Sequence, residues 1–208
     1  WLAPPHDVHE REKIAGHFAM SFAVYRLPNK LETFEFLLQH GASPDLRTHM
    51  GTSVLHAAVR NVDVDLRVVK RVIEESKDAT LINYRVTPSK TKWKWLLGIC
   101  NRMYKMRIMR SAFIEYYAPM IGSTCLHMAL FHGDVDLIEM LLDHGADPRI
   151  EDGLGRNAFG YLKIYGPFPK VRGLMERATR SLSRFESEAS SREEEEDVLE
   201  EEEESSKE

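Results

Sequence analysis

The feature of this sequence that most constrains the fold is an internal repeat. His-Gly-Ala at 40–42 recurs at 144–146, and in each copy a second glycine follows the first after ten residues. A glycine of the same kind, Gly122, lies 33 residues before Gly155. The segment after Gly122 (Ser-Thr-Cys-Leu-His-Met-Ala-Leu) matches the segment after Gly51 (Thr-Ser-Val-Leu-His-Ala-Ala-Val). A period of this length predicts structural units that stack in a row and bury their apolar faces against each other.

Each unit is predicted to contain two helices. The first helix is short and begins after a polar residue suited to an N-cap, which is Ser53, Thr124 or Asn157. The second helix has one apolar face, as expected for a helix packed on a core. In the unit before Gly155 that face consists of Leu137, Ile138, Leu141 and Leu142. Gly41 and Gly145 follow the second helices, where glycine adopts a left-handed C-cap without strain.

These motifs resemble those of the ankyrin-repeat family, which read G-x-T-P-L-H-x-A-A and then L-L-x-x-G-A-D-P. The resemblance covers about residues 16–84 and 122–178. It implies an all-α solenoid of three to four stacked helix-turn-helix units with projecting hairpin loops. It also implies that His56 and His127 hydrogen-bond to a neighbouring loop. The units around 18–23 and 159–160 depart from the motif, as expected for terminal repeats that face water on one side.

The array is interrupted between its second and third units. Gly51 and Gly122 are 71 residues apart, which exceeds one period by 38. The excess is either a decayed repeat or an insertion on a projecting hairpin, at about residues 85–120. We favour the insertion because the segment contains no Gly-Ala or Leu-His register.

The inserted segment is basic and aromatic. It holds eight Lys or Arg residues against one acidic residue, Glu115, and 95–117 contains no proline. A basic amphipathic helix of this kind suits RNA phosphate, an acidic protein surface or, least favoured, a membrane surface. Alternatively, the tryptophans and methionines anchor the insertion on the solenoid while Lys and Arg are solvated. The two interpretations are compatible, because one face of the helix can dock on the solenoid while the basic face binds a partner. The candidate residues for an anionic partner are Lys90, Lys92, Trp93, Lys94, Trp95, Arg102, Lys105, Arg107 and Arg110.

The C-terminal segment has the opposite charge. Residues 186–208 contain thirteen Asp or Glu against two basic residues, a net charge of −11, and few apolar side chains. Such a segment cannot bury enough surface to offset the entropy of ordering, so we expect disorder, or at most transient helix. Its role is either to keep the chain soluble or to fold back on the basic insertion and compete with an anionic partner. The expected organisation is an N-terminal extension (1–15), an ankyrin-repeat domain (16–180) and a disordered acidic tail (181–208).

No catalytic, phosphate-binding or metal-binding motif occurs, so we expect no enzyme activity, no cofactor and no metal. The resemblance implies a protein–protein interaction module or scaffold, a monomer or part of a hetero-complex. The alternative is a subunit of a large ribonucleoprotein or organellar assembly that contacts nucleic acid through the insertion. The partner-binding candidates are exposed first-helix residues and the hairpin residues Thr48, His49, Met50, Glu151, Asp152 and Leu154.

The compartment is only coarsely constrained. Two cysteines, Cys100 and Cys125, are too few for a disulfide framework and favour a reducing, intracellular location. Whether this is the cytoplasm, the nucleus or an organelle stays open. The chain begins with Trp1, and we expect the native N-terminus to lie upstream.

Overall fold

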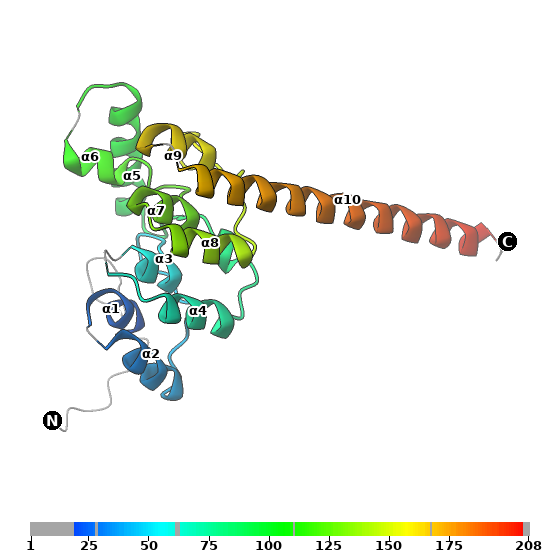
Figure 1. The fold of residues 1–208 in the computed structure, drawn as a ribbon, viewed down its shortest axis with the longest axis horizontal. Coiled ribbons are helices and arrows are strands. Elements are labelled where there is room, and N and C mark those ends of the chain that lie inside the picture. Colours follow the sequence, from blue (N-terminus) through cyan, green and yellow to red (C-terminus); the bar gives the residue numbers. More distant parts are fainter. Residues whose placement is uncertain (1–18, 28, 61–62, 110, 167, 206–208) are drawn as a thin grey trace.

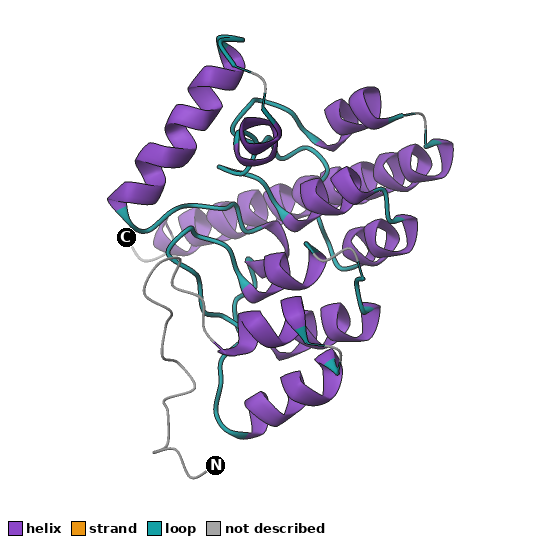
Figure 2. Ribbon diagram, turned by 90° about the vertical axis from the view of Figure 1, so that its left-hand side faces the viewer, coloured by secondary structure: helices purple, strands orange, loops and turns teal. Residues whose placement is uncertain are grey.

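In the part of the chain that the structure describes, four pairs of helices follow one another, and they stack in one array (Figures 1 and 2). This is a computed structural model, and it describes residues 19–205 apart from 28, 61–62, 110 and 167. The helices are α1 (Ala19–Arg26), α2 (Lys30–Gln39), α3 (Val54–Val59), α4 (Leu66–Glu75), η1 (Leu81–Asn83, a 3-10 turn), α5 (Thr91–Lys105), α6 (Ala112–Tyr117), α7 (Cys125–His132), α8 (Val135–Asp143), α9 (Ala158–Tyr165) and α10 (Pro169–Ser205). The described residues include no β-strand, only an isolated bridge between Arg47 and Ser53. The predicted all-α solenoid is confirmed.

The inner helices α1, α3, α7 and α9 pack on one another in that order, while α2, α4, α8 and α10 form the outer layer. One continuous core runs between the two layers. Its fully buried side chains include Phe34, Leu55, Leu126, Leu137, Leu141 and Met175. Because each helix pair contacts mainly its neighbours, the stability of the array depends on every interface between repeats.

The predicted N-caps are present. The side chains of Ser53 and Asn157 accept hydrogen bonds from backbone N–H groups three residues later, at 3.2 and 3.1 Å. Thr124 forms a capping box with His127, whose Nδ1 lies 2.9 Å from the threonine hydroxyl. These bonds satisfy N–H groups that the first turn of a helix leaves without a partner.

The repeat histidines connect successive repeats. His56 is fully buried, and its Nε2 lies 3.4 Å from the carbonyl oxygen of Ser123, at the start of the next repeat. The equivalent His127 places Nε2 3.1 Å from the carbonyl oxygen of Arg156. Both therefore bond to a neighbouring loop, as the family resemblance implied.

The extra residues between the second and third repeats extend the hairpin between these repeats, and we interpret them as an insertion. Val86 donates to Ser123 and accepts from Gly122, both at 2.9 Å, which is the backbone pattern that Thr48 and Asp152 form in their own hairpins. Residues 87–121 therefore replace the two residues that the other hairpins have at 49–50 and 153–154. Moreover, α3 packs directly on α7, which leaves no place in the array for a further repeat.

The insertion forms two helices rather than the single helix expected over 95–117. Helix α5 ends at Lys105, the chain turns through Arg107 with a positive φ of 55°, and α6 begins at Ala112. A small core of its own fastens it to the hairpins. Buried in that core are Met50, Val86, Leu97 and Met120. Asn101 adds hydrogen bonds from Nδ2 to the carbonyl oxygens of Ala118 and Gly153, at 3.0 and 2.9 Å.

The acidic tail is helical, which differs from the expected disorder. The first turns of α10 bury Val171, Leu174 and Met175 in the main core, and the helix then continues to Ser205. Because the first turns of α10 are held in the main core, the rest of the helix needs no nucleation of its own. The following residues are rich in Glu and Arg, which have high helix propensity and extend the helix. Arg149 adds a bidentate ion pair with Glu186, at 2.6 and 2.9 Å. Figure 1 shows α10 leading away from the insertion, so the structure gives no support to the fold-back hypothesis.

Two glycines with the same backbone conformation provide a matched test of the insertion's attachment. Gly41 and Gly51 have φ of +83° and +84°, but a Cβ would meet open space at Gly41 and overlap the carbonyl group of Thr87 at Gly51. We expect Gly41→Ala to lower the free energy of unfolding by about 1–2 kcal/mol, from the left-handed conformation alone. Gly51→Ala should lose about 1–3 kcal/mol more, because backbone must move. Urea denaturation of both variants measures the difference, and equal losses would contradict the close approach.

Candidate protein-binding groove

Three of the six hairpin residues predicted to bind a partner are not accessible at the surface. Thr48, Met50 and Asp152 are buried, whereas His49, Glu151 and Leu154 reach the surface. The prediction was wrong for the buried three because neighbouring hairpins stack side by side and cover these side chains. Thr48 bonds to the hydroxyl of Thr52 at 2.7 Å, and Met50 belongs to the insertion's core.

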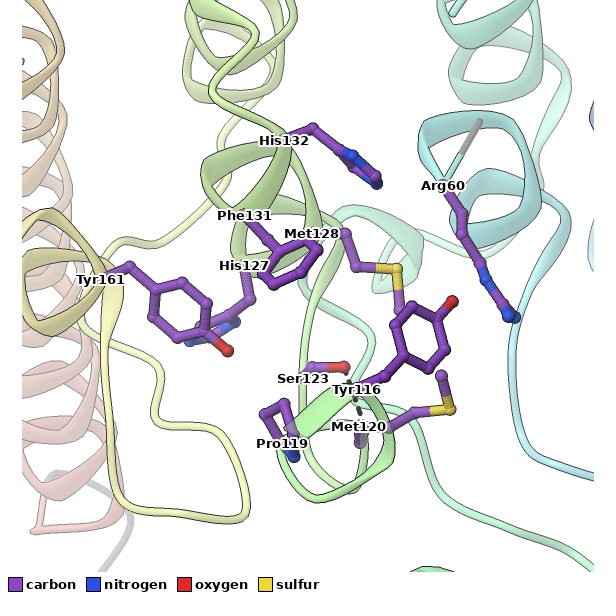
Figure 3. Close-up of a pocket in the computed structure, with 10 residues that line it drawn as sticks. All are labelled: Arg60, Tyr116, Pro119, Met120, Ser123, His127, Met128, Phe131, His132 and Tyr161. Carbon is purple, nitrogen blue, oxygen red and sulfur yellow. Dashed lines mark hydrogen bonds between the residues drawn. The ribbon is translucent and has the colours of Figure 1, made fainter. Parts of the chain in front are cut away.

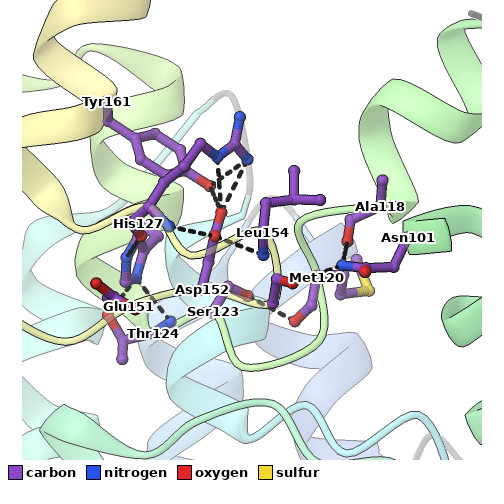
Figure 4. A network of polar contacts seen from close by, with 12 residues as sticks. Asn101, Ala118, Met120, Ser123, Thr124, His127, Glu151, Asp152, Leu154 and Tyr161 are labelled. Atoms are coloured by element: carbon purple, nitrogen blue, oxygen red, sulfur yellow. Dashed lines mark hydrogen bonds and ion pairs between the residues drawn. The ribbon is translucent and has the colours of Figure 1, made fainter. Parts of the chain in front are cut away.

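Asp152 organises the third hairpin from inside (Figure 4). Its Oδ1 accepts from the backbone N–H groups of Leu154 and Arg156, at 2.8 and 2.9 Å. Its Oδ2 accepts from the Arg156 guanidinium at 2.8 and 3.0 Å and from the Tyr161 hydroxyl at 2.9 Å. All of its acceptor capacity is used within the chain, so this carboxylate is structural.

The surface left open lies on the inner helices. Phe131 at the end of α7 and Tyr165 at the end of α9 are both exposed, and their rings are 5.4 Å apart in an edge-to-face contact. The insertion's α6 closes the other side of this groove, because Tyr116 and Met120 lie across from α7 (Figure 3). The groove is thus walled by a solenoid face and by the insertion.

Arg60, the C-cap residue of α3, lies at the junction of two pockets in this groove. One, of about 280 Å³, is formed with α1, and the other, of about 50 Å³, is formed with α6 and α7. The guanidinium lies 4.9 Å from the ring centroid of Tyr116 and 5.8 Å from that of Tyr25. Its buried Nε has no hydrogen-bond partner, and among the described residues no carboxylate forms an ion pair with Arg60.

Burial shifts the pKa values of three side chains around the groove in the direction that favours their neutral forms. Burial, aided by the positive charge of Arg60, lowers the pKa of His132. Burial raises the pKa of the Tyr116 phenol further above neutral pH. Burial likewise lowers the pKa of His127 at the base of the groove. The guanidinium therefore gives the groove a positive centre between aromatic rings.

The structure gathers the predicted basic residues of the insertion on α5 and the loop after it. Exposed side chains there are Lys90, Lys92, Lys94, Trp95, Arg102, Lys105 and Arg107, and Trp93 is half-buried. Arg110 lies outside the described residues. Sequence reasoning pointed to exposed first-helix residues without naming Arg60 or Phe131. The repeat register could have found both, since each follows its repeat histidine by four residues.

The described residues contain no cluster of three or more His, Cys, Asp or Glu that could hold a metal ion. Both cysteines are buried, and burial raises the pKa of each thiol. None of the described helices is both long and apolar enough to cross a bilayer.

The chain belongs to the ankyrin-repeat family. A family model described as ankyrin repeats, in three copies, matches residues 20–152. An ankyrin repeat-containing protein of Treponema pallidum (strain Nichols) is 26% identical over 152 residues, which are 71% of this chain and 48% of that protein. The palmitoyltransferase AKR1 of Lachancea kluyveri is 30% identical over 95 residues, which are 45% of this chain and 13% of that protein. The chain spans about half or less of these curated relatives, and its ankyrin repeats indicate a protein–protein interaction module.

Proposed function

We propose that this chain is a non-catalytic module that binds a segment of another protein in the groove between the inner helices and the insertion. The observation that carries the proposal is Arg60, a partly buried cation between two pockets with which no carboxylate of the described residues forms an ion pair. Arginine and aromatic side chains are the residues that most often dominate binding energy at protein interfaces. The transferase activity in the name of one relative is no part of this proposal.

The groove favours a partner segment with a carboxylate next to apolar side chains. A carboxylate can accept two parallel hydrogen bonds from a guanidinium, and such charge-assisted pairs are the strong ones. The exposed rings of Phe131 and Tyr165 offer apolar area beside it. Catalysis is not supported, because His127 and Asp152 already use their polar atoms to hold helix starts and hairpins together.

Arg60→Gln is expected to weaken such binding about tenfold or more, because the charge-assisted pair with the partner is lost. Random twelve-residue peptides displayed on phage are selected on the wild-type chain, and their dissociation constants are measured by fluorescence polarisation. We expect enrichment of Asp or Glu and a loss of affinity for both Arg60→Gln and Phe131→Ala. Phe185→Ala, at an exposed ring on α10, is the control. Selected peptides that bind Arg60→Gln as tightly as the wild type would contradict this proposal.

Contact between the insertion and an anionic partner is a second candidate function. It is favoured by cations that form no ion pair within the described chain, which are Lys90, Lys94, Arg102, Lys105 and Arg107. Binding of RNA through these residues would fall steeply with salt, because counterions are released from phosphates. Charge alone does not distinguish RNA from other anionic partners, whereas the apolar side chains of the same segment do.

A further inference from the structure

The insertion exposes an unusual number of large apolar side chains. Six of them are between 48% and 69% exposed, and they are Trp95, Ile99, Met106, Ile108, Met109 and Phe113. The sequence interpretation that the tryptophans and methionines anchor the insertion therefore fails for Trp95, Met106 and Met109. The interpretation holds for Trp93, which packs against the small core beside Leu97, and Asn101 adds its hydrogen bonds.

Helix geometry places the exposed side chains opposite the docked face of α5. At 100° per residue, Trp95, Ile99 and Met106 fall within about 40° of one another around the helix axis. Buried Leu97 and the hydrogen-bonding Asn101 lie on the far side of the same helix. Ile108 and Met109, in the loop that follows α5, are exposed as well. We call these five apolar residues, with Phe113, the outer face of the insertion.

Positive charge accompanies the outer face. Arg102 lies within the apolar stripe of α5, Lys94 and Lys105 lie along one side of it, and Arg107 lies in the loop that extends it. The insertion carries one acidic residue, Glu115 on α6. Figures 1 and 2 show α5 at the edge of the molecule, projecting from the hairpin side of the array.

We propose that the outer face docks on the surface of an anionic lipid bilayer, with its apolar side chains in the headgroup region and its cations on lipid phosphates and carboxylates. Amphipathic segments that combine Lys and Arg with Trp, Phe and aliphatic residues bind membranes in this way. RNA is the weaker fit, because RNA contacts use cations and stacked rings, whereas exposed Ile99, Ile108 and the methionines add nothing to them. The membrane, least favoured from sequence, becomes the favoured anionic partner once these side chains are seen to be exposed.

Vesicle flotation of the full chain tests the proposal. The wild-type chain is expected to float with vesicles of 70% phosphatidylcholine and 30% phosphatidylserine, and not with phosphatidylcholine alone. The triple variant Trp95→Ala, Ile108→Ala, Met109→Ala should lower the partition coefficient at least about tenfold, because apolar burial is lost. The variant Lys94→Glu, Lys105→Glu should lower it by a similar factor, because each cation near an anionic surface contributes favourably.

Controls separate membrane docking from RNA binding and from self-association. Phe185→Ala removes an equally exposed ring from α10 and should float as the wild type does. All variants are checked for an unchanged melting temperature, which is expected because the replaced side chains are exposed. A labelled twenty-nucleotide single-stranded RNA is titrated in parallel. Binding of RNA but not of vesicles, flotation of the apolar triple variant at the wild-type level, or self-association without flotation would each overturn the proposal.

Discussion

Replacing Asp152 by alanine is expected to destabilise the chain by about 3–5 kcal/mol, because it leaves a buried guanidinium without its counterion. The Asp152 side chain is fully buried and that of Arg156 is 16% exposed. The substitution also removes the acceptor for two backbone N–H groups and for the Tyr161 hydroxyl. The hairpin that contains Asp152 and the start of α9 should therefore lose their fixed geometry together. Urea denaturation followed by circular dichroism measures the loss.

A second ion pair with the same sequence spacing provides the control. Arg184 and Glu188 are also four residues apart, but both side chains are exposed on α10. Glu188→Ala should change the free energy of unfolding by about 0–1 kcal/mol, because exposed pairs are screened by water. The double variant Asp152→Ala, Arg156→Ala should lose less than the sum of the single losses, because no charge then stays buried alone. Equal losses for Asp152→Ala and Glu188→Ala would contradict the structural role given to Asp152.

The sequence predicted the repeats well because they obey local rules. Glycine spacing, N-cap residues and the Leu-His helix start each depend on a few neighbouring residues, so the pattern alone located them. The histidine bonds across repeats at His56 and His127 followed from the family resemblance. The position of the insertion also followed, since the register resumes at Gly122.

The sequence could not predict which side chains of the hairpins and of the insertion are buried. A loop position predicts exposure in general, yet Thr48 and Asp152 are buried because adjacent hairpins cover them. Similarly, the pattern of the insertion could not tell which side of α5 docks on the hairpins. The docked side includes Leu97 and Asn101, and the partner of Asn101 at Gly153 is 52 residues away in the chain. The groove around Arg60 combines residues of α1, α3, α6, α7 and α9, which only the folded array brings together.

The stability of the array is expected to fall in mild acid, and His56 is the main reason. Burial lowers the pKa of His56 to about 4 from an ordinary value of 6.5. Between these two values the unfolded chain binds a proton that the folded chain excludes, so unfolding is favoured as pH falls. The full contribution is present above pH 6.5 and is lost progressively towards pH 4. A shift of this size corresponds to about 3 kcal/mol for a fully buried group. Burial also lowers the pKa of His127, which adds to the loss in the same direction.

His56→Gln separates the titration of this side chain from its packing. At pH 7.5 the variant should be less stable than the wild type, because the contacts with Ser53 and the carbonyl of Ser123 are disturbed. Between pH 6.5 and 4.5 its stability should depend on pH less steeply than that of the wild type, because one buried titrating group is gone. His144→Gln, at an exposed ring, is the control and should keep the wild-type slope. Urea denaturation at half-unit pH steps measures all three chains. A wild-type stability that stays constant from pH 7.5 to 4.5 would show that the folded chain tolerates protonated His56. The conclusion that buried neutral histidines connect successive repeats would then be wrong.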